Sequence, residues 1–322
     1  MDTVDHACET LDLAWRLLRL NGLGASDLVR LSSAHTNDVY RADEAYVVRI
    51  CRTPGSEHRL RAEAELLRRI RDTVPVQPVV ACGVVDGAAY QILGYIEGQS
   101  LSRCWHTLSR AGIESMARDL AAHLRSLHAL TQDGFGYFSV PAVTGTTWRD
   151  FILGMFGQLR DGILQGPVDA CVSEALDEAG RYLRIHAGCL DGGGSARTIH
   201  NDLWFSNILV RDGRLTGFVD FEFAERAPVD KELYKIELFC RMPEVFEEQG
   251  DFSSFIPALK TSYPEMFEHP ELSTRLGVYD LLVFWKSHRH DVAAGRVGES
   301  DVPARAIAVT NDIVSGRMAR LV

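Results

Sequence analysis

The sequence predicts an α+β fold in two lobes, with a small antiparallel sheet in the N-terminal lobe and a larger, mainly helical C-terminal lobe. Three observations support this. Residues 29–50 and 76–97 are strand-like, and a helical pattern separates them. After Gly98 the character changes to long helical patterns. We therefore expect one domain over residues 1–97 and a second over residues 98–322.

Composition excludes several classes of protein. The chain has 322 residues, of which 46% are hydrophobic and 24% charged, as in ordinary soluble enzymes. Its net charge of −10 argues against a nucleic-acid partner, because phosphate backbones attract basic surfaces. No apolar run approaches the ~20 residues of a membrane span. The seven cysteines are scattered and suggest reduced thiols, so we expect a cytoplasmic monomer or homodimer.

An ion pair is predicted within the N-terminal lobe. Residues Glu57 to Arg71 form an amphipathic helical pattern, and Glu63 falls in the middle of its apolar stripe. A carboxylate on the buried side of a helix needs a partner, and Arg49 on a nearby strand is the natural candidate. Such a pair would grip the phosphates of a nucleotide. The alternative is that Glu63 pairs with Arg59 on a solvated edge of its own helix.

Two further segments of this lobe are candidates for nucleotide contacts. Leu31 to Tyr40 is a polar turn, containing Ser33 and Asn37, that could aim backbone N–H groups at phosphate. Gln91 to Gly98 is a strand ending in a linker, where backbone groups near Gly94 and Ile96 could bond a purine edge. An ordinary surface turn at Glu97-Gly98 is the alternative.

The most informative motif is the run from His200 to Asn207, followed by Asp220. Its His-x-Asp-x₄-Asn spacing is that of a kinase catalytic loop. In this pattern Asp202 orients or deprotonates a substrate hydroxyl, while Asn207 and Asp220 hold Mg²⁺ against nucleotide phosphates. A hairpin with strands at 208–210 and 215–223 would bring Asn207 beside Asp220. The alternative is a polar turn and a solvated strand residue.

The remaining polar residues receive weaker assignments. His128 and His200 are expected to be packed, hydrogen-bonded histidines that support the structure. Downstream of Asp220 the chain is acidic, so a cationic substrate could be recognised there. The candidate side chains are Glu222, Asp230, Glu232 and Glu237. The alternative is an acidic, solvated helix face.

These motifs resemble the aminoglycoside phosphotransferase and choline kinase superfamily, from about Leu31 to Phe239. The resemblance implies a two-lobed protein-kinase-like fold, Mg²⁺, and ATP or GTP as phosphoryl donor. It also implies Asp202 as catalytic base, with Asn207 and Asp220 as metal ligands. The acceptor would be a hydroxyl of a small molecule, with an antibiotic favoured and a cationic one expected.

Two other functions stay open: a choline, ethanolamine or other small-metabolite kinase, and an inactive kinase fold that serves as a binding module. The sequence also departs from the family pattern in two places. Arg49 replaces the usual lysine. Residues 227–233 form a stretched version of the family's Asp-Pro-x-x-Asp-Leu pattern.

Overall fold

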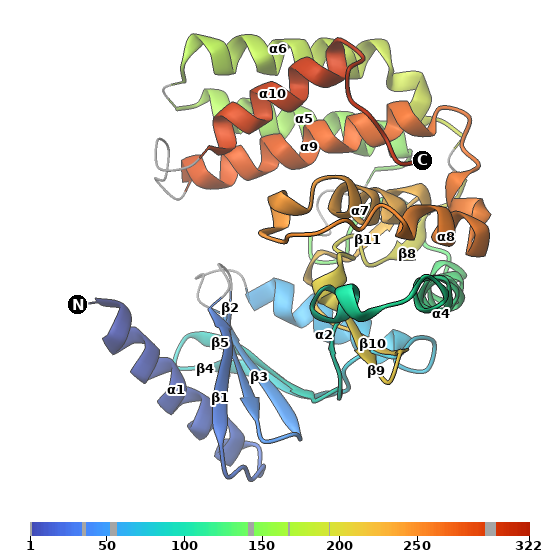
Figure 1. Ribbon diagram of the computed structural model, residues 1–322. Helices are drawn as coiled ribbons and strands as arrows, with labels where there is room; N and C mark the ends of the chain where they lie inside the picture. The colour runs from blue at the N-terminus through green and yellow to red at the C-terminus, as the bar shows by residue number, and fades with distance from the viewer. Residues whose placement is uncertain are drawn as a thin grey trace. The chain divides into compact units, whose positions relative to one another are not determined.

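The computed structural model of the protein describes residues 2–33, 37–51, 57–140, 145–166, 168–192, 194–293 and 301–322. The chain divides into two compact units (Figure 1). The first, here the sheet unit, comprises Met1–Leu127, Phe138–Val140 and Trp204–Ala224; the second, the helical unit, comprises His128–Tyr137, Pro141–Leu203 and Glu225–Val322. The predicted boundary at residue 97 thus differs from this division, because residues 98–127 and 204–224 pack with the sheet.

The sheet unit is built on five antiparallel strands in the order β1-β2-β3-β5-β4. Their bounds are β1 Leu28–Ser33, β2 Asn37–Ala42, β3 Tyr46–Cys51, β4 Val79–Val85 and β5 Ala88–Gly94. Helix α1, Asp2–Leu20, packs on β2 and β3 through a core that includes Leu17, Tyr40 and Ile92. Tyr46, Val48 and Ile50 of β3 lie on this face, as their alternation predicted.

Helix α2, Glu57–Ile70, packs against β4 and β5. Its buried residues include Leu60, Leu67 and Ile70, the predicted apolar stripe, and Glu63 lies among them. The helical period therefore placed a carboxylate inside the sheet unit, where it requires a cation.

A second, three-stranded sheet of this unit has the order β10-β9-β6. It consists of β6 Gln99–Ser100, β9 Ile208–Arg211 and β10 Arg214–Phe218. Short helices α3 Leu101–Cys104, η1 Trp105–Thr107, η4 Phe205–Asn207 and η5 Phe221–Phe223 flank it, and α4 spans Arg110–His128. The predicted hairpin is present, but its second strand was predicted too long. It ends at Phe218, because Asp220 adopts a left-handed conformation and starts a 3₁₀ turn.

The helical unit contains a small sheet in the order β7-β11-β8, formed by β7 Gly136–Tyr137, β8 Arg197–Ile199 and β11 Glu225–Ala227. Its helices are α5 Trp148–Leu164, α6 Ala170–Ile185, α7 Asp230–Arg241, α8 Phe255–Ser262, α9 Leu272–Ala293 and α10 Val302–Val314. Short 3₁₀ helices lie at η3 Ala187–Leu190, η6 Pro243–Phe246 and η7 Pro264–Phe267. Helices α5, α6, α9 and α10 pack against one another (Figure 1).

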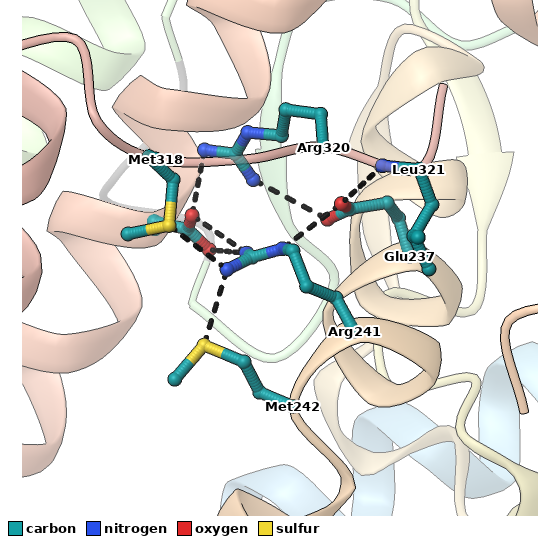
Figure 2. A network of polar contacts seen from close by, with 7 residues as sticks. Glu237, Arg241, Met242, Met318, Arg320 and Leu321 are labelled. Carbon is teal, nitrogen blue, oxygen red and sulfur yellow. Dashed lines mark hydrogen bonds and ion pairs between the residues drawn. The ribbon is translucent and has the colours of Figure 1, made fainter. Parts of the chain in front are cut away.

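A buried ionic network ties the C-terminal segment to α7 and α9. Glu237 on α7 accepts hydrogen bonds from Arg241, Arg320 and the Leu321 backbone (Figure 2). Both arginines also bind Asp280 on α9, which burial leaves with a raised pKa despite these partners. Because these carboxylates are fully buried, they stay charged only through such partners. In the part of the chain described, no helix has the length and apolar character that a membrane crossing requires.

Candidate active site

The loop that carries Asp202 is held through its backbone N–H groups. Strand β8 ends at Ile199, and the Glu232 carboxylate accepts the N–H groups of His200 and Asn201 at 2.6 and 3.0 Å. Asn201 is left-handed, with a φ of 61°, so the chain turns sharply before Asp202. The Nδ1 atom of His200 accepts the Asp202 N–H at 3.3 Å. His200 therefore braces the loop, as predicted.

Asp202 is the partly exposed carboxylate of this loop. Its side chain is 17% exposed, and its Oδ1 atom lies 2.8 Å from the Nζ atom of Lys235 on α7. An aspartate that keeps some solvent access on a rigid loop is suited to meet a hydroxyl and accept its proton. The pairing with Lys235 was not predicted from the sequence.

Asn207 and Asp220 lie in the sheet unit, at the two ends of the hairpin. The Val219 N–H donates to the Asn207 carbonyl at 3.1 Å, which holds the two segments side by side. Asp220 has a φ of 66°, a conformation that aspartate tolerates better than most residues. The hairpin thus brings the segments of Asn207 and Asp220 together, although Asp220 sits in a turn and not on a strand face.

The chemistry of these two residues fits Mg²⁺. Among the described residues, no group of three or more His, Cys, Asp or Glu side chains could hold a metal, so an all-protein cage is not present there. An amide and a carboxylate are hard oxygen donors, and Mg²⁺ on nucleotides uses few protein ligands together with phosphate and water. The Asp220 side chain is 41% exposed and accessible to such an ion.

The packing beside the hairpin depends on one glycine. A Cβ atom at Gly217, in the bulge of β10, would lie 2.6 Å from the Ile96 side chain and 3.3 Å from the Pro75 carbonyl. Glycine is therefore required for the linker at Ile96 to approach this strand.

Arg49 on β3 binds three carboxylates of the sheet unit. Its guanidinium lies 2.6 Å from Glu63, 3.0 Å from Asp220 and 3.3 Å from Glu222. Burial alone would lower the pKa of Arg49, but these carboxylates outweigh it and raise that pKa. Burial raises the pKa of Glu63 to about 7, opposed by Arg49. The predicted Arg49–Glu63 pair is present, and Arg49 links it directly to Asp220.

Glu222 is part of the same cluster. Its Oε2 atom accepts a hydrogen bond from the Asn37 side chain at 3.0 Å, and its Oε1 atom lies 3.5 Å from Arg59. Arg59, the alternative partner considered for Glu63, thus pairs with Glu222. The Asn37 side chain is buried and points at a carboxylate. The charge of Glu222 is balanced by these partners within the sheet unit.

The other predicted nucleotide contacts have mixed outcomes. Ser33 ends β1, but its side chain and residues 34–36 lie outside the described residues. The Gly94 N–H donates to Pro78, and its carbonyl accepts from Gln77, so these backbone groups are occupied. At Ile96 the described residues make no backbone hydrogen bond. Ile96 thus remains the better candidate for contacting a purine edge.

Three acidic residues predicted to meet the substrate are instead internal. Asp230 accepts hydrogen bonds from Nε and Nη2 of Arg275 at 2.7 and 2.9 Å, and Glu232 accepts the backbone N–H groups of the loop that carries Asp202. Glu237 belongs to the network in Figure 2. Burial of at least 96% leaves none of them exposed to a ligand. This corrects the expectation, because a buried and compensated carboxylate presents no free charge to a cation.

Two charged residues near the loop escaped the sequence reasoning. Glu225 on β11 and Lys231 on α7 are buried, and among the described residues neither Glu225 oxygen has a hydrogen-bond partner. Burial raises the pKa of Glu225 to about 7 and lowers that of Lys231 to about 8. The rarity of lysine in this sequence is a signal that could have drawn attention to Lys231. The chain has four lysines, at positions 231, 235, 260 and 286, and its other basic residues are arginines.

Comparisons with known proteins agree with this architecture. Hygromycin-B 4-O-kinase of Escherichia coli is 24% identical over 313 residues, covering 89% of this chain and 87% of that protein. The aminoglycoside phosphotransferase APH(4)-Ia, in a ternary complex with ADP and hygromycin B, superposes with a TM-score of 0.69 at 20% identity, covering 95% and 99% of the two chains. The streptomycin–ATP–APH(2'')-IIa ternary complex superposes with a TM-score of 0.69 at 18% identity, covering 98% of each chain.

These solved structures show that the protein has the kinase-like fold of aminoglycoside phosphotransferases, as predicted. The model of the phosphotransferase enzyme family matches residues 27–245. Because this match covers more than half of the chain, the protein belongs to the phosphotransferase enzyme family.

Proposed function

We propose that this protein transfers the terminal phosphoryl group of a nucleoside triphosphate, bound with Mg²⁺, to a hydroxyl of a small polar molecule. The observation that carries the proposal is the catalytic loop. Asp202 is partly exposed on a backbone that Glu232 and His200 hold rigid. A group that must accept a proton in the transition state benefits from such preorganisation.

The sheet unit supplies the residues for the nucleotide. Asn207 and Asp220 would hold Mg²⁺, which neutralises charge on the phosphate oxygens when bound. Arg49, anchored by Glu63, would contact the phosphates, and the backbone at Ile96 would contact the purine. ATP is the favoured donor because relatives of this fold bind ADP and ATP.

The favoured acceptor is an aminoglycoside or related hydroxylated antibiotic, because the curated relative is a hygromycin-B 4-O-kinase. A small-metabolite kinase is the second candidate. It is favoured by the internal pairing of Asp230, Glu232 and Glu237, which removes the acidic surface expected for a polycation. We propose that the protein acts in the cytoplasm.

The test is a turnover screen with Mg-ATP and Mg-GTP. The acceptor panel contains hygromycin B, other aminoglycosides, nucleosides and amino alcohols, and mass spectrometry identifies the phosphorylated product. Asp202→Asn should lower kcat by a factor on the order of 100 or more, while nucleotide binding stays near normal. Acceptor-independent turnover, or an Asp202→Asn variant as active as the wild type, would contradict the proposal.

A further inference from the structure

The carboxylate of the catalytic loop is held differently from the structural carboxylates around it. Arg275 engages both oxygens of Asp230, and Arg241 engages both oxygens of Asp280. Asp202 is instead held at Oδ1 by a lysine, in a chain that contains only four lysines. A guanidinium fork matches a carboxylate at both oxygens, whereas an ammonium is a compact point charge.

Lys235 is itself fixed in place. Its Nζ atom lies 2.8 Å from Asp202 and 5.3 Å from the centre of the Phe246 ring on η6. The Lys235 and Asp202 side chains are each 17% exposed, so water screens their attraction only in part. Ring and carboxylate together restrict the ammonium to one position.

Helix α7 therefore holds the catalytic loop through two separate contacts. Glu232 binds the backbone N–H groups of His200 and Asn201, and Lys235 binds the side chain of Asp202. Residues three apart lie on the same face of a helix, so one face of α7 supplies both contacts. The backbone contact sets where the loop lies, and the side-chain contact sets where its carboxylate points.

We propose that Lys235 is a positioning residue for phosphoryl transfer, an inference that rests on the function proposed above. Its ammonium balances the charge of Asp202 and holds the carboxylate in the orientation that receives the acceptor's proton. In the reaction, the acceptor oxygen bonds to the γ-phosphorus as the bond from that phosphorus to the bridging oxygen breaks. Asp202 takes the hydroxyl proton, the nucleoside diphosphate leaves, and Lys235 keeps its own protons.

The scarcity of lysine allows a test that does not depend on activity. Reductive methylation with carbon-13 formaldehyde keeps the lysine charge and gives each reactive lysine its own NMR signal. A Lys235→Arg variant identifies the signal of Lys235. We expect Asp202→Asn to move this signal and to leave that of Lys260 unchanged. Lys260 is a matched control, because it lies 5.5 Å from the Phe267 ring centre in the same unit.

Kinetics then test the role in catalysis, with hygromycin B or the best acceptor of the panel. Lys235→Met should lower kcat by roughly 10- to 100-fold and change the nucleotide KM by less than about twofold, because a misplaced base weakens only the transition state. Lys235→Arg should recover part of the loss, since it restores the charge. Lys260→Met should match the wild type.

The outcomes separate this inference from the function on which it rests. An unmoved Lys235 signal in Asp202→Asn, or a Lys235→Met enzyme within twofold of wild type while Asp202→Asn is inactive, overturns the positioning role alone. Wild-type turnover in Asp202→Asn overturns the proposed function, and with it any catalytic role for Lys235.

Discussion

Glu225 is the most unusual charged residue of the helical unit. It is fully buried, and in the part of the chain that the structure describes neither of its carboxylate oxygens has a hydrogen-bond partner. Burial raises its pKa to about 7, even though Lys231 and Lys286 act to lower it. We predict that Glu225→Gln stabilises the protein relative to the wild type as the pH rises toward 8, because the amide stays neutral at a site where burial disfavours the charged carboxylate.

The gain should depend on pH in a defined direction. In the unfolded chain a glutamate titrates near pH 4.3, whereas the folded protein keeps Glu225 protonated up to about pH 7. Between these values unfolding releases a proton, so the wild type loses stability as pH rises. The advantage of Glu225→Gln should therefore grow by about 2–3 kcal/mol between pH 5 and pH 8, as an upper limit for a group coupled to Lys231.

The assay is urea unfolding of wild type and variant at a series of pH values from 5 to 8. Glu232→Gln is the matched control, because it is an equally buried glutamate of the same unit whose two oxygens accept backbone N–H groups. In that variant the amide N–H₂ group would lie against a backbone N–H donor. Its free energy of unfolding should therefore fall by about 1–3 kcal/mol. An effect of Glu225→Gln that does not change with pH, or a loss of stability equal to that of the control, would contradict this prediction.

Three further predictions concern other ionic contacts. Asp220→Ala should abolish Mg²⁺-dependent binding of ADP in calorimetry, whereas Asp212→Ala, an exposed aspartate of the same hairpin, should bind normally. Glu63→Gln and Arg49→Met should each lower kcat/KM, with the double variant little worse than either; fully additive losses would mean that the two residues act independently. Arg275→Met should cost about 3–5 kcal/mol in thermal or urea unfolding, since it leaves Asp230 buried and unpaired, and a loss below about 1 kcal/mol would contradict this.

The sequence predicted elements whose signal is periodic. Two strand-like stretches, 29–50 and 76–97, contain the strands of the five-stranded sheet, and the 3.6-residue period located α2 with Glu63 on its buried face. The end of β10 was missed because alternation continues past Phe218 in the sequence, while Asp220 leaves the strand through a left-handed turn. A backbone reversal of this kind leaves the pattern of apolar residues unchanged, so periodicity cannot detect it.

Pairing across the chain was predicted only where few candidates were considered. For Glu63 these were Arg49 on a nearby strand and Arg59 on its own helix, and Arg49 is its partner. For Asp230 and Glu237, the partners Arg275 and Arg320 come from 45 and 83 residues away. Among so many arginines, sequence alone offers no way to choose between them. These acidic residues were therefore predicted to bind a substrate, although arginines within the fold already neutralise their charge.

The charge of the acceptor consequently cannot be inferred from the acidic composition after Asp220. Glu232, which looked like a candidate for cation binding, contacts the backbone of the catalytic loop. A cation, Lys235, lies against Asp202. A cationic acceptor must then find its carboxylates elsewhere, or approach Asp202 against the repulsion of this ammonium. Added salt screens this repulsion. The KM of a cationic acceptor should therefore rise less with ionic strength than it would if the acceptor bound a surface rich in exposed carboxylates.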